Sequence, residues 1–143
     1  MKVLVDANIL ISIMLSPRGV PGAILDRAIS GSFSLLVSEH TLAEVLRSCR
    51  GKPYIAQRVS PSRAEGFVDA IRTGSIVLPT LEPPFEPYTR DPKDDYLIAH
   101  ALAEDVDILV SGDRDLLALN GVYPFRILAP AAFIALLHEE TAT

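Results

Sequence analysis

Residues 90–117 read RDPKDDYLIAHALAEDVDILVSGDRDLL, and they join an acid-capped helix to a short apolar strand. Asp91 followed by Pro92 is typical of a helix N-terminus, because aspartate accepts hydrogen bonds from free backbone N–H groups and proline fits the first turn. Residues 108–110, Ile-Leu-Val, are apolar and bounded by polar residues, as expected of a strand buried on both faces. The stretch therefore predicts a helix that leads into a core strand of a parallel sheet.

Two acids of this stretch, Asp95 and Asp113, are expected to face one crevice. Helical spacing puts Asp95 on the apolar side of its helix, together with Ile98, so its carboxylate leaves the first turn along the buried stripe. Asp113 and Asp115 follow the strand 108–110 at its carboxyl end. Ligands of open parallel α/β sheets bind outside that edge. The stretch thus predicts half of a metal site.

Apolar strands and helical patterns alternate along the whole chain. Strands are expected at 2–5, 34–37, 75–78, 108–110 and 126–128, and helices at 9–15, 23–29, 38–49, 61–72, from 92 onward, 116–119 and 131–138, with a short helix after Pro53. This alternation predicts a parallel sheet with helices on both faces. Residues 79–89, PTLEPPFEPYT, contain four prolines and are expected to form a stiff loop beside the crevice.

The composition fits one globular domain that spans residues 1–143, since 49% of the residues are hydrophobic and the chain is long enough to bury a core. Cys49 is the only cysteine, and its place in an apolar helical pattern predicts a buried thiol in a reducing compartment. No apolar run approaches the ~20 residues that a membrane span needs. We therefore expect a soluble, cytoplasmic protein.

The charge is distributed unevenly. A net charge of -5 argues against a broad basic surface for nucleic acid. Residues 47–72 nevertheless contain six basic side chains against two acids, whereas acids are concentrated in residues 82–115. One end of the molecule could bind phosphates and the other a metal ion, and Lys52, Arg58 and Arg63 are the candidates for holding a substrate backbone.

Two further acids complete the expected cluster. Asp6 ends the strand 2–5 as Asp113 ends the strand 108–110, so a functional role is favoured, whereas Asn8 is more simply a helix cap. Glu44 lies beside the apolar stripe of its helix, where spacing alone indicates an exposed acid. If Asp6, Glu44, Asp95 and Asp113 converge, each pair at ~5 Å repels by about 3 kcal/mol at an effective dielectric near 20.

Such a cluster requires a cation, and oxygen ligands favour Mg²⁺ or Mn²⁺. The corresponding chemistry is metal-assisted attack of water on a phosphodiester. The three histidines lack zinc-site spacing, and the chain contains no phosphate-binding glycine loop, dinucleotide fingerprint or serine-hydrolase elbow. Nucleotide-cofactor and serine-hydrolase functions therefore lose their support.

Four motifs together resemble the PIN-domain nucleases, in particular the small ribonuclease toxins of bacterial and archaeal toxin-antitoxin modules. The motifs are VLVDANIL with Asp6 and Asn8, SEHTLAEVL with Glu44, DDYLIAHAL with Asp95, and LVSGDRDLL with Ser111, Asp113 and Asp115. Each is weak alone, but the four occur in the family's order and spacing over the whole chain. The doublet at the third motif allows two registers, of which helix phase favours Asp95 over Asp94.

The resemblance implies a three-layer α/β/α sandwich with a central, mostly parallel sheet. It also implies a metal-dependent endoribonuclease, a hydrolase in which Asp6, Glu44, Asp95 and Asp113 are catalytic and bind Mg²⁺ or Mn²⁺, supported by Asn8, Ser111 and Asp115. RNA would be the substrate, a small antitoxin protein the partner, and a homodimer the assembly. In that case Lys52, Arg58 and Arg63 would hold the RNA backbone.

Three alternative interpretations fit the sequence less well. A haloacid-dehalogenase-like phosphatase needs a second acid where this chain has Asn8, and Asp115 follows Asp113 too closely to be its distal acid. A receiver-like signalling module needs a phosphoacceptor after a middle strand, yet no aspartate occurs between Asp26 and Asp69. A catalytically weak PIN fold that serves as a partner-binding scaffold is the remaining alternative, which the retained acids disfavour.

Overall fold

A computed structural model describes residues 1–142 and places five strands in one sheet. The strands are β1 (Lys2–Val5), β2 (Ser34–Ser38), β3 (Ile76–Leu78), β4 (Ile108–Val110) and β5 (Arg126–Leu128), in the order β3-β2-β1-β4-β5. Every neighbouring pair is parallel. The predicted parallel sheet is confirmed, and all five strands lie within two residues of the expected ranges.

The helices are α1 (Ala7–Leu15), α2 (Val20–Ile29), α3 (Glu39–Gly51), α4 (Pro53–Ala56), α5 (Pro61–Gly74), α6 (Asp95–Ala103), α7 (Arg114–Leu117) and α8 (Pro130–Ala142), and a 3₁₀ turn, η1 (Pro92–Asp94), precedes α6. Asp6, Ser38 and Ser60 cap α1, α3 and α5 by accepting a backbone N–H bond. Some predicted helix starts are corrected: α2 begins three residues earlier than predicted, α1 and α7 begin two residues earlier, and the helix after Asp91 begins as a 3₁₀ turn.

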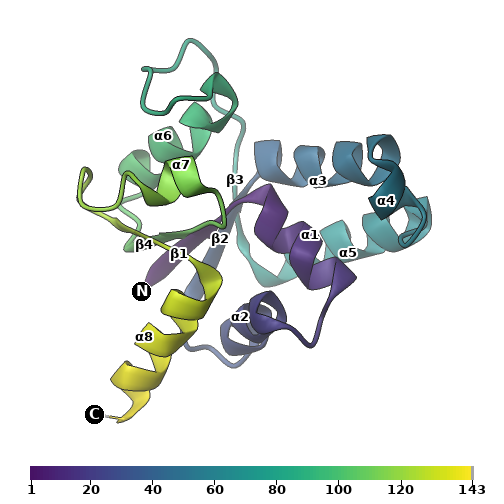
Figure 1. Cartoon of the computed structure of the whole chain (residues 1–143), viewed down its shortest axis with the longest axis horizontal. Coiled ribbons are helices and arrows are strands. Elements are labelled where there is room, and N and C mark those ends of the chain that lie inside the picture. Colours follow the sequence, from purple (N-terminus) through teal and green to yellow (C-terminus); the bar gives the residue numbers. More distant parts are fainter. Residues whose placement is uncertain (143) are drawn as a thin grey trace.

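Both faces of the sheet are covered, as the apolar strands require. In β1, Val3 and Val5 face the larger core with α1, α2, α3, α5 and α8, whereas Leu4 faces a second core with α6 and α7. Figure 1 shows α6 and α7 on one side of the sheet and α1, α2, α3 and α5 on the other. Side chains therefore alternate between two buried layers. The predicted three-layer α/β/α sandwich is confirmed.

Two smaller expectations concern membranes and the cysteine. Within residues 1–142, no single helix is long and apolar enough to cross a membrane; α1 and α2 reach that length only together, and they are bent by 100°. Cys49 is free and buried, as predicted, and burial raises the pKa of its thiol.

Candidate active site

The candidate site lies at the carboxyl edge of the sheet, between β1 and β4. Val5 is paired with Val110, so the residues that follow them, Asp6 and Ser111, leave the sheet side by side. The chain builds β2 and β3 on one side of β1 and then β4 and β5 on the other. Such a change of direction creates a crevice at which α/β proteins bind ligands. The structure thus brings Asp6 and the segment that follows β4 together at this edge.

Asp6 is the most enclosed acid of this crevice, with 6% of its surface exposed. Its Oδ1 accepts a hydrogen bond from the Ile9 backbone N–H at 3.0 Å, and its Oδ2 accepts one from the Ser111 hydroxyl at 2.5 Å. Burial raises the pKa of the Asp6 carboxyl; these two hydrogen bonds oppose the rise, and the charges of Glu44 and Asp113 add to it. The fold therefore fixes this carboxylate in place and makes its charge costly.

Ser111 connects Asp6 to Asp113. While its hydroxyl donates to Asp6, its Oγ accepts the backbone N–H of Asp113 at 3.0 Å. Asp113 in turn caps α7 by accepting the backbone N–H of Asp115 at 2.8 Å. The predicted supporting role of Ser111 has a geometric basis here, whereas Asp115 supports Asp113 through its backbone and its side chain is exposed.

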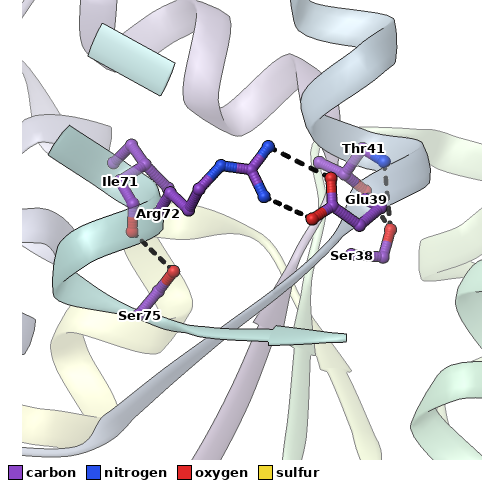
Figure 2. A network of polar contacts seen from close by, with 6 residues as sticks. All are labelled: Ser38, Glu39, Thr41, Ile71, Arg72 and Ser75. Atoms are coloured by element: carbon purple, nitrogen blue, oxygen red, sulfur yellow. Dashed lines mark hydrogen bonds and ion pairs between the residues drawn. The ribbon is translucent and has the colours of Figure 1, made fainter. Parts of the chain in front are cut away.

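Glu44 reaches the site from α3, whose first turn is firmly held. Figure 2 shows the Ser38 hydroxyl oxygen accepting the Thr41 backbone N–H, and the Arg72 guanidinium pairing with both oxygens of Glu39. Ser75 closes the end of α5 by donating to the Ile71 carbonyl oxygen at 2.6 Å. The ion pair joins the start of α3 to the end of α5.

Tyr96 connects Glu44 to the opposite side of the crevice. Its hydroxyl donates to Glu44 Oε2 at 3.4 Å and lies 3.1 Å from Thr41 Oγ1. Burial raises the pKa of the Tyr96 hydroxyl, so it remains protonated and able to donate. Sequence reasoning missed this residue, since a tyrosine in an apolar helix is usually a core side chain.

Asp94 is the fourth acid of the cluster, and the sequence-based prediction preferred its neighbour. Burial raises the pKa of Asp94 to about 6, with further contributions from Asp113, Asp91, Glu44 and Asp6. These contributions place Asp94 within electrostatic range of the other acids of the crevice. We therefore group Asp94 with Asp6, Glu44 and Asp113 as the acid cluster.

Asp95 has a different environment. It is 5% exposed, as helix phase predicted, but its Oδ1 accepts hydrogen bonds from both the backbone N–H and the hydroxyl of Thr89, each at 2.8 Å. It is not among the principal charges that shift the pKa of Asp6 or Asp94. This side chain thus anchors the end of the proline-rich loop 79–89, and the role of Asp95 as a metal ligand stays a prediction.

Two of the three predicted substrate-binding cations are engaged elsewhere. Arg58 donates to the Leu15 carbonyl oxygen at 3.2 Å, and Arg63 donates to the Met14 carbonyl oxygen at 2.8 Å. Cations at the C-terminal carbonyls of a helix complement its dipole. These arginines therefore stabilise the end of α1, whereas Lys52 is exposed beyond α3. Asn8 is also exposed, and its supporting role stays a prediction.

A cleft adjoins the acid cluster between α3 and the segment that precedes α6. It has a volume of about 310 Å³, and its lining includes Glu44, Arg47, Lys93, Phe85 and Tyr96. The predicted loop beside the crevice thus contributes Phe85 to a wall of this cleft. Glu44 belongs to both the cleft and the acid cluster, so the two are continuous.

The acid cluster has the chemistry of a site for a hard divalent cation. Its donors are carboxylate oxygens, and burial and mutual repulsion raise the pKa of Asp6 and Asp94. Among residues 1–142, no three acidic, histidine or cysteine side chains are grouped tightly enough to coordinate one ion as they stand. The donor types fit Mg²⁺ or Mn²⁺, and an ion bound here would have to draw the carboxylates closer together.

Comparison with known proteins agrees with this architecture. A family model described as PIN domain matches residues 2–115, which include Asp6, Glu44, Asp94, Asp95 and Asp113. An uncharacterized protein of Methanocaldococcus jannaschii, MJ1680, is 27% identical over 124 residues, which cover 83% of this chain and 75% of that protein.

Three solved structures share the fold over most of both chains. PAE2754 from Pyrobaculum aerophilum has a TM-score of 0.66 at 20% identity, over 97% of this chain and 96% of that chain. VapBC2 from Rickettsia felis, solved bound to a DNA fragment from its promoter, has a TM-score of 0.61 at 11% identity, over 90% and 98%. VapC20 from Mycobacterium tuberculosis, described as a toxin that cleaves the sarcin-ricin loop, has a TM-score of 0.58 at 16% identity, over 87% and 98%.

Proposed function

We propose that this chain, which belongs to the PIN-domain family, is a metal-dependent endoribonuclease that hydrolyses RNA phosphodiester bonds. The observation that supports this proposal is the cluster of Asp6, Glu44, Asp94 and Asp113 at the carboxyl edge of β1 and β4, where acids raise the pKa of their neighbours. Acids that repel one another in a partly buried crevice are stabilised by a cation, and a bound cation then attracts phosphate.

Mg²⁺ or Mn²⁺ would be held by these four carboxylates, with Asp95 as the alternative to Asp94. When bound, the ion supplies Lewis-acid stabilisation of the phosphate and lowers the pKa of a coordinated water. The residues of the chain keep the carboxylates in place: Ser111 orients Asp6, and Tyr96 orients Glu44. Groups that orient ligands in this way have strong effects on metal affinity.

The biological setting that we propose is a toxin-antitoxin module, with this chain as the toxin. The support is the fold shared with VapBC2, which was solved bound to a DNA fragment from its promoter, and with VapC20, a toxin that cleaves the sarcin-ricin loop. We accordingly propose a small antitoxin as the partner, a homodimer as the assembly and the cytoplasm as the location. Co-expression with the product of an adjacent small reading frame, followed by co-purification and a toxicity assay, tests this setting.

The activity is tested by incubating the purified chain with mixed structured and unstructured RNAs in Mg²⁺, Mn²⁺ or excess EDTA. Cleavage should require the metal and should be abolished by Asp6→Asn, which keeps the size of the side chain but removes its charge. Asp26→Asn is the matched control, because Asp26 is exposed on α2 and should leave cleavage unchanged. Persistent cleavage in EDTA, or equal activity of the Asp6 variant, would refute the proposal and favour a partner-binding scaffold.

A further inference from the structure

Three buried hydroxyl groups form a hydrogen-bonded chain, the hydroxyl chain, between the end of β2 and Glu44. Ser38 Oγ lies 3.0 Å from Thr41 Oγ1, and Thr41 Oγ1 lies 3.1 Å from the Tyr96 hydroxyl. The Tyr96 hydroxyl lies 3.4 Å from Glu44 Oε2. Ser38 and Thr41 are completely buried, and 6% of the surface of Tyr96 is exposed. The hydroxyl chain therefore connects α3 to α6 beside the acid cluster in a place that water hardly reaches.

The protons of the hydroxyl chain are ordered in one direction. Each hydroxyl group has a single proton to donate, and an ionised carboxylate can only accept. Because the Tyr96 proton is donated to Glu44, Thr41 must be the donor in its contact with Tyr96. Ser38 in turn donates to Thr41, while its oxygen accepts the Thr41 backbone N–H at 3.0 Å, the contact drawn in Figure 2. All three protons thus point toward Glu44, and hydrogen bonds arranged in series strengthen one another.

The ring of Tyr96 is held by aromatic contacts from both helices. His40 of α3 stacks on its face, with ring centroids 4.7 Å apart and an interplanar angle of 21°. His100 of α6 meets it at an interplanar angle of 87°, with centroids 6.3 Å apart. His100 is itself buried, with 2% of its surface exposed. These contacts restrict the ring, so the direction of the Tyr96 hydroxyl is set by packing as well as by hydrogen bonds.

The hydroxyl chain occupies one oxygen of Glu44 and leaves the other. Oε2 accepts the Tyr96 proton, whereas no residue within 1–142 makes a hydrogen bond or ion pair with Oε1. The contact with Tyr96 is also the longest in the hydroxyl chain, so Glu44 can still move when an ion draws the carboxylates together. A carboxylate that offers one oxygen suits an octahedral ion such as Mg²⁺ or Mn²⁺, whereas Ca²⁺ often takes both oxygens.

We propose that Thr41 and Tyr96 are positioning residues that present Glu44 to the ion through Oε1 alone and so favour Mg²⁺ or Mn²⁺ over Ca²⁺. This inference rests on the proposed metal-dependent nuclease function and adds a structural basis for the choice of ion. Hydroxyl groups that only stabilised the fold would influence the affinities for both kinds of ion equally. The ratio of the affinities for Mn²⁺ and Ca²⁺ therefore distinguishes positioning from stabilisation.

Isothermal titration calorimetry of the purified chain with Mn²⁺ and with Ca²⁺ tests this inference independently of cleavage. Tyr96→Phe keeps the ring between His40 and His100 but removes the hydroxyl, and it should weaken Mn²⁺ binding about 10- to 100-fold. Ca²⁺ binding should weaken less, because Oε2 becomes free for the larger ion, so the Mn²⁺-to-Ca²⁺ ratio falls. Tyr123→Phe is the matched control, because it removes a hydroxyl that donates to the Tyr88 carbonyl oxygen at 3.2 Å, and it should leave both affinities unchanged.

The middle of the hydroxyl chain is tested at Thr41, which donates to Tyr96 rather than to Glu44. Thr41→Val keeps the shape of the side chain but removes its hydroxyl, so it should lower the Mn²⁺-to-Ca²⁺ ratio as Tyr96→Phe does, by a smaller factor. Thr41→Ser retains a hydroxyl and should restore the ratio of the parent. Ser38 is left unchanged because its oxygen also caps α3. Thermal melting of each variant in EDTA confirms that it is folded.

The outcomes separate this proposal from the function on which it rests. An unchanged ratio in Tyr96→Phe would overturn the positioning role, even if the parent chain cleaves RNA, and a ratio that falls in Tyr96→Phe but not in Thr41→Val would overturn the role of Thr41. An equal loss of affinity for the two ions would assign these hydroxyls to stability alone, and failure of the parent to bind Mn²⁺ would also overturn the proposal. If the ratio depends on Tyr96 but no RNA is cleaved in Mn²⁺, the positioning role stands and the nuclease proposal fails.

Discussion

Paired substitutions of Asp94 and Asp95 should change the stability of the metal-free protein in opposite directions. Asp94 lies among the acids of the crevice, whereas Asp95 accepts two hydrogen bonds from Thr89. Replacing Asp94 by Asn removes a repelled charge. Replacing Asp95 by Asn weakens two charge-assisted hydrogen bonds and buries an amide group that has no evident partner. The two variants thus separate a site carboxylate from a structural one at adjacent positions.

The size of each effect follows from these environments. The rise of the Asp94 pKa from 3.8 to about 6 corresponds to about 3 kcal/mol. Solvent screening at this partly exposed carboxyl reduces that figure to about 1 to 2 kcal/mol. For Asp95, weakened bonds to a buried carboxylate and one buried amide cost about 2 to 4 kcal/mol. For a chain of this size, about 3 °C per kcal/mol is expected.

Thermal unfolding in EDTA at pH 7.5 measures both effects. Asp94→Asn should melt about 3 to 6 °C above the parent, and Asp95→Asn about 6 to 12 °C below it. Added Mn²⁺ should raise the melting temperature of the parent and of Asp95→Asn, but that of Asp94→Asn by less, because a ligand has been lost. The reverse pattern, with Asp95→Asn melting higher and losing its response to Mn²⁺, would refute this reasoning and restore Asp95 as the ligand.

Three further predictions concern pH, Ser111 and Arg63. The pKa of Asp94 is higher in the folded protein than its unfolded value of 3.8. The metal-free parent should therefore lose about 1 to 2 kcal/mol of stability relative to Asp94→Asn as the pH rises from about 4 to about 6. Urea titrations measure this difference, and equal pH profiles for the two proteins would contradict the prediction. Ser111→Ala should destabilise the protein by about 1 to 3 kcal/mol and weaken Mn²⁺ binding in calorimetry, because the buried Asp6 carboxylate loses a donor. Arg63→Gln should lower the melting temperature by a few degrees, since its bond to the Met14 carbonyl is worth about 1 kcal/mol, and should leave the salt slope of RNA binding unchanged; a flatter slope would return Arg63 to the substrate path.

Most of the fold could be predicted because its signals are local. Apolar runs such as 108–110 are buried on both faces, and side-chain caps such as Ser38 and Ser60 mark where helices begin. A parallel sheet then follows from the alternation of strands and helices. The order of its strands was not predicted, because pairing depends on packing between segments that are far apart in the chain.

The site could be predicted only in part, because burial has more than one cause. Asp6 and Asp113 were expected at the carboxyl edge from their position after a strand, and the structure places them there. Asp95 was expected there because it lies on a buried stripe. In the structure its buried carboxylate accepts two hydrogen bonds from Thr89. Arg63 was expected to hold substrate from local charge alone, whereas a backbone carbonyl accepts its hydrogen bond. Sequence spacing does not reveal which hydrogen-bond partner a buried or charged side chain has in the folded protein.

Three neighbouring residues at the start of α6 contact three different parts of the protein. Successive side chains around a helix differ by about 100° in direction. Asp94, at the end of η1, lies among the acids of the crevice; Asp95 binds Thr89 of the loop; and Tyr96 binds Glu44 of α3. The same turn therefore connects the acid cluster, the proline-rich loop and α3. A shift of one residue in this turn would exchange these contacts, so the register of the turn decides which of the two aspartates lies nearer the other acids.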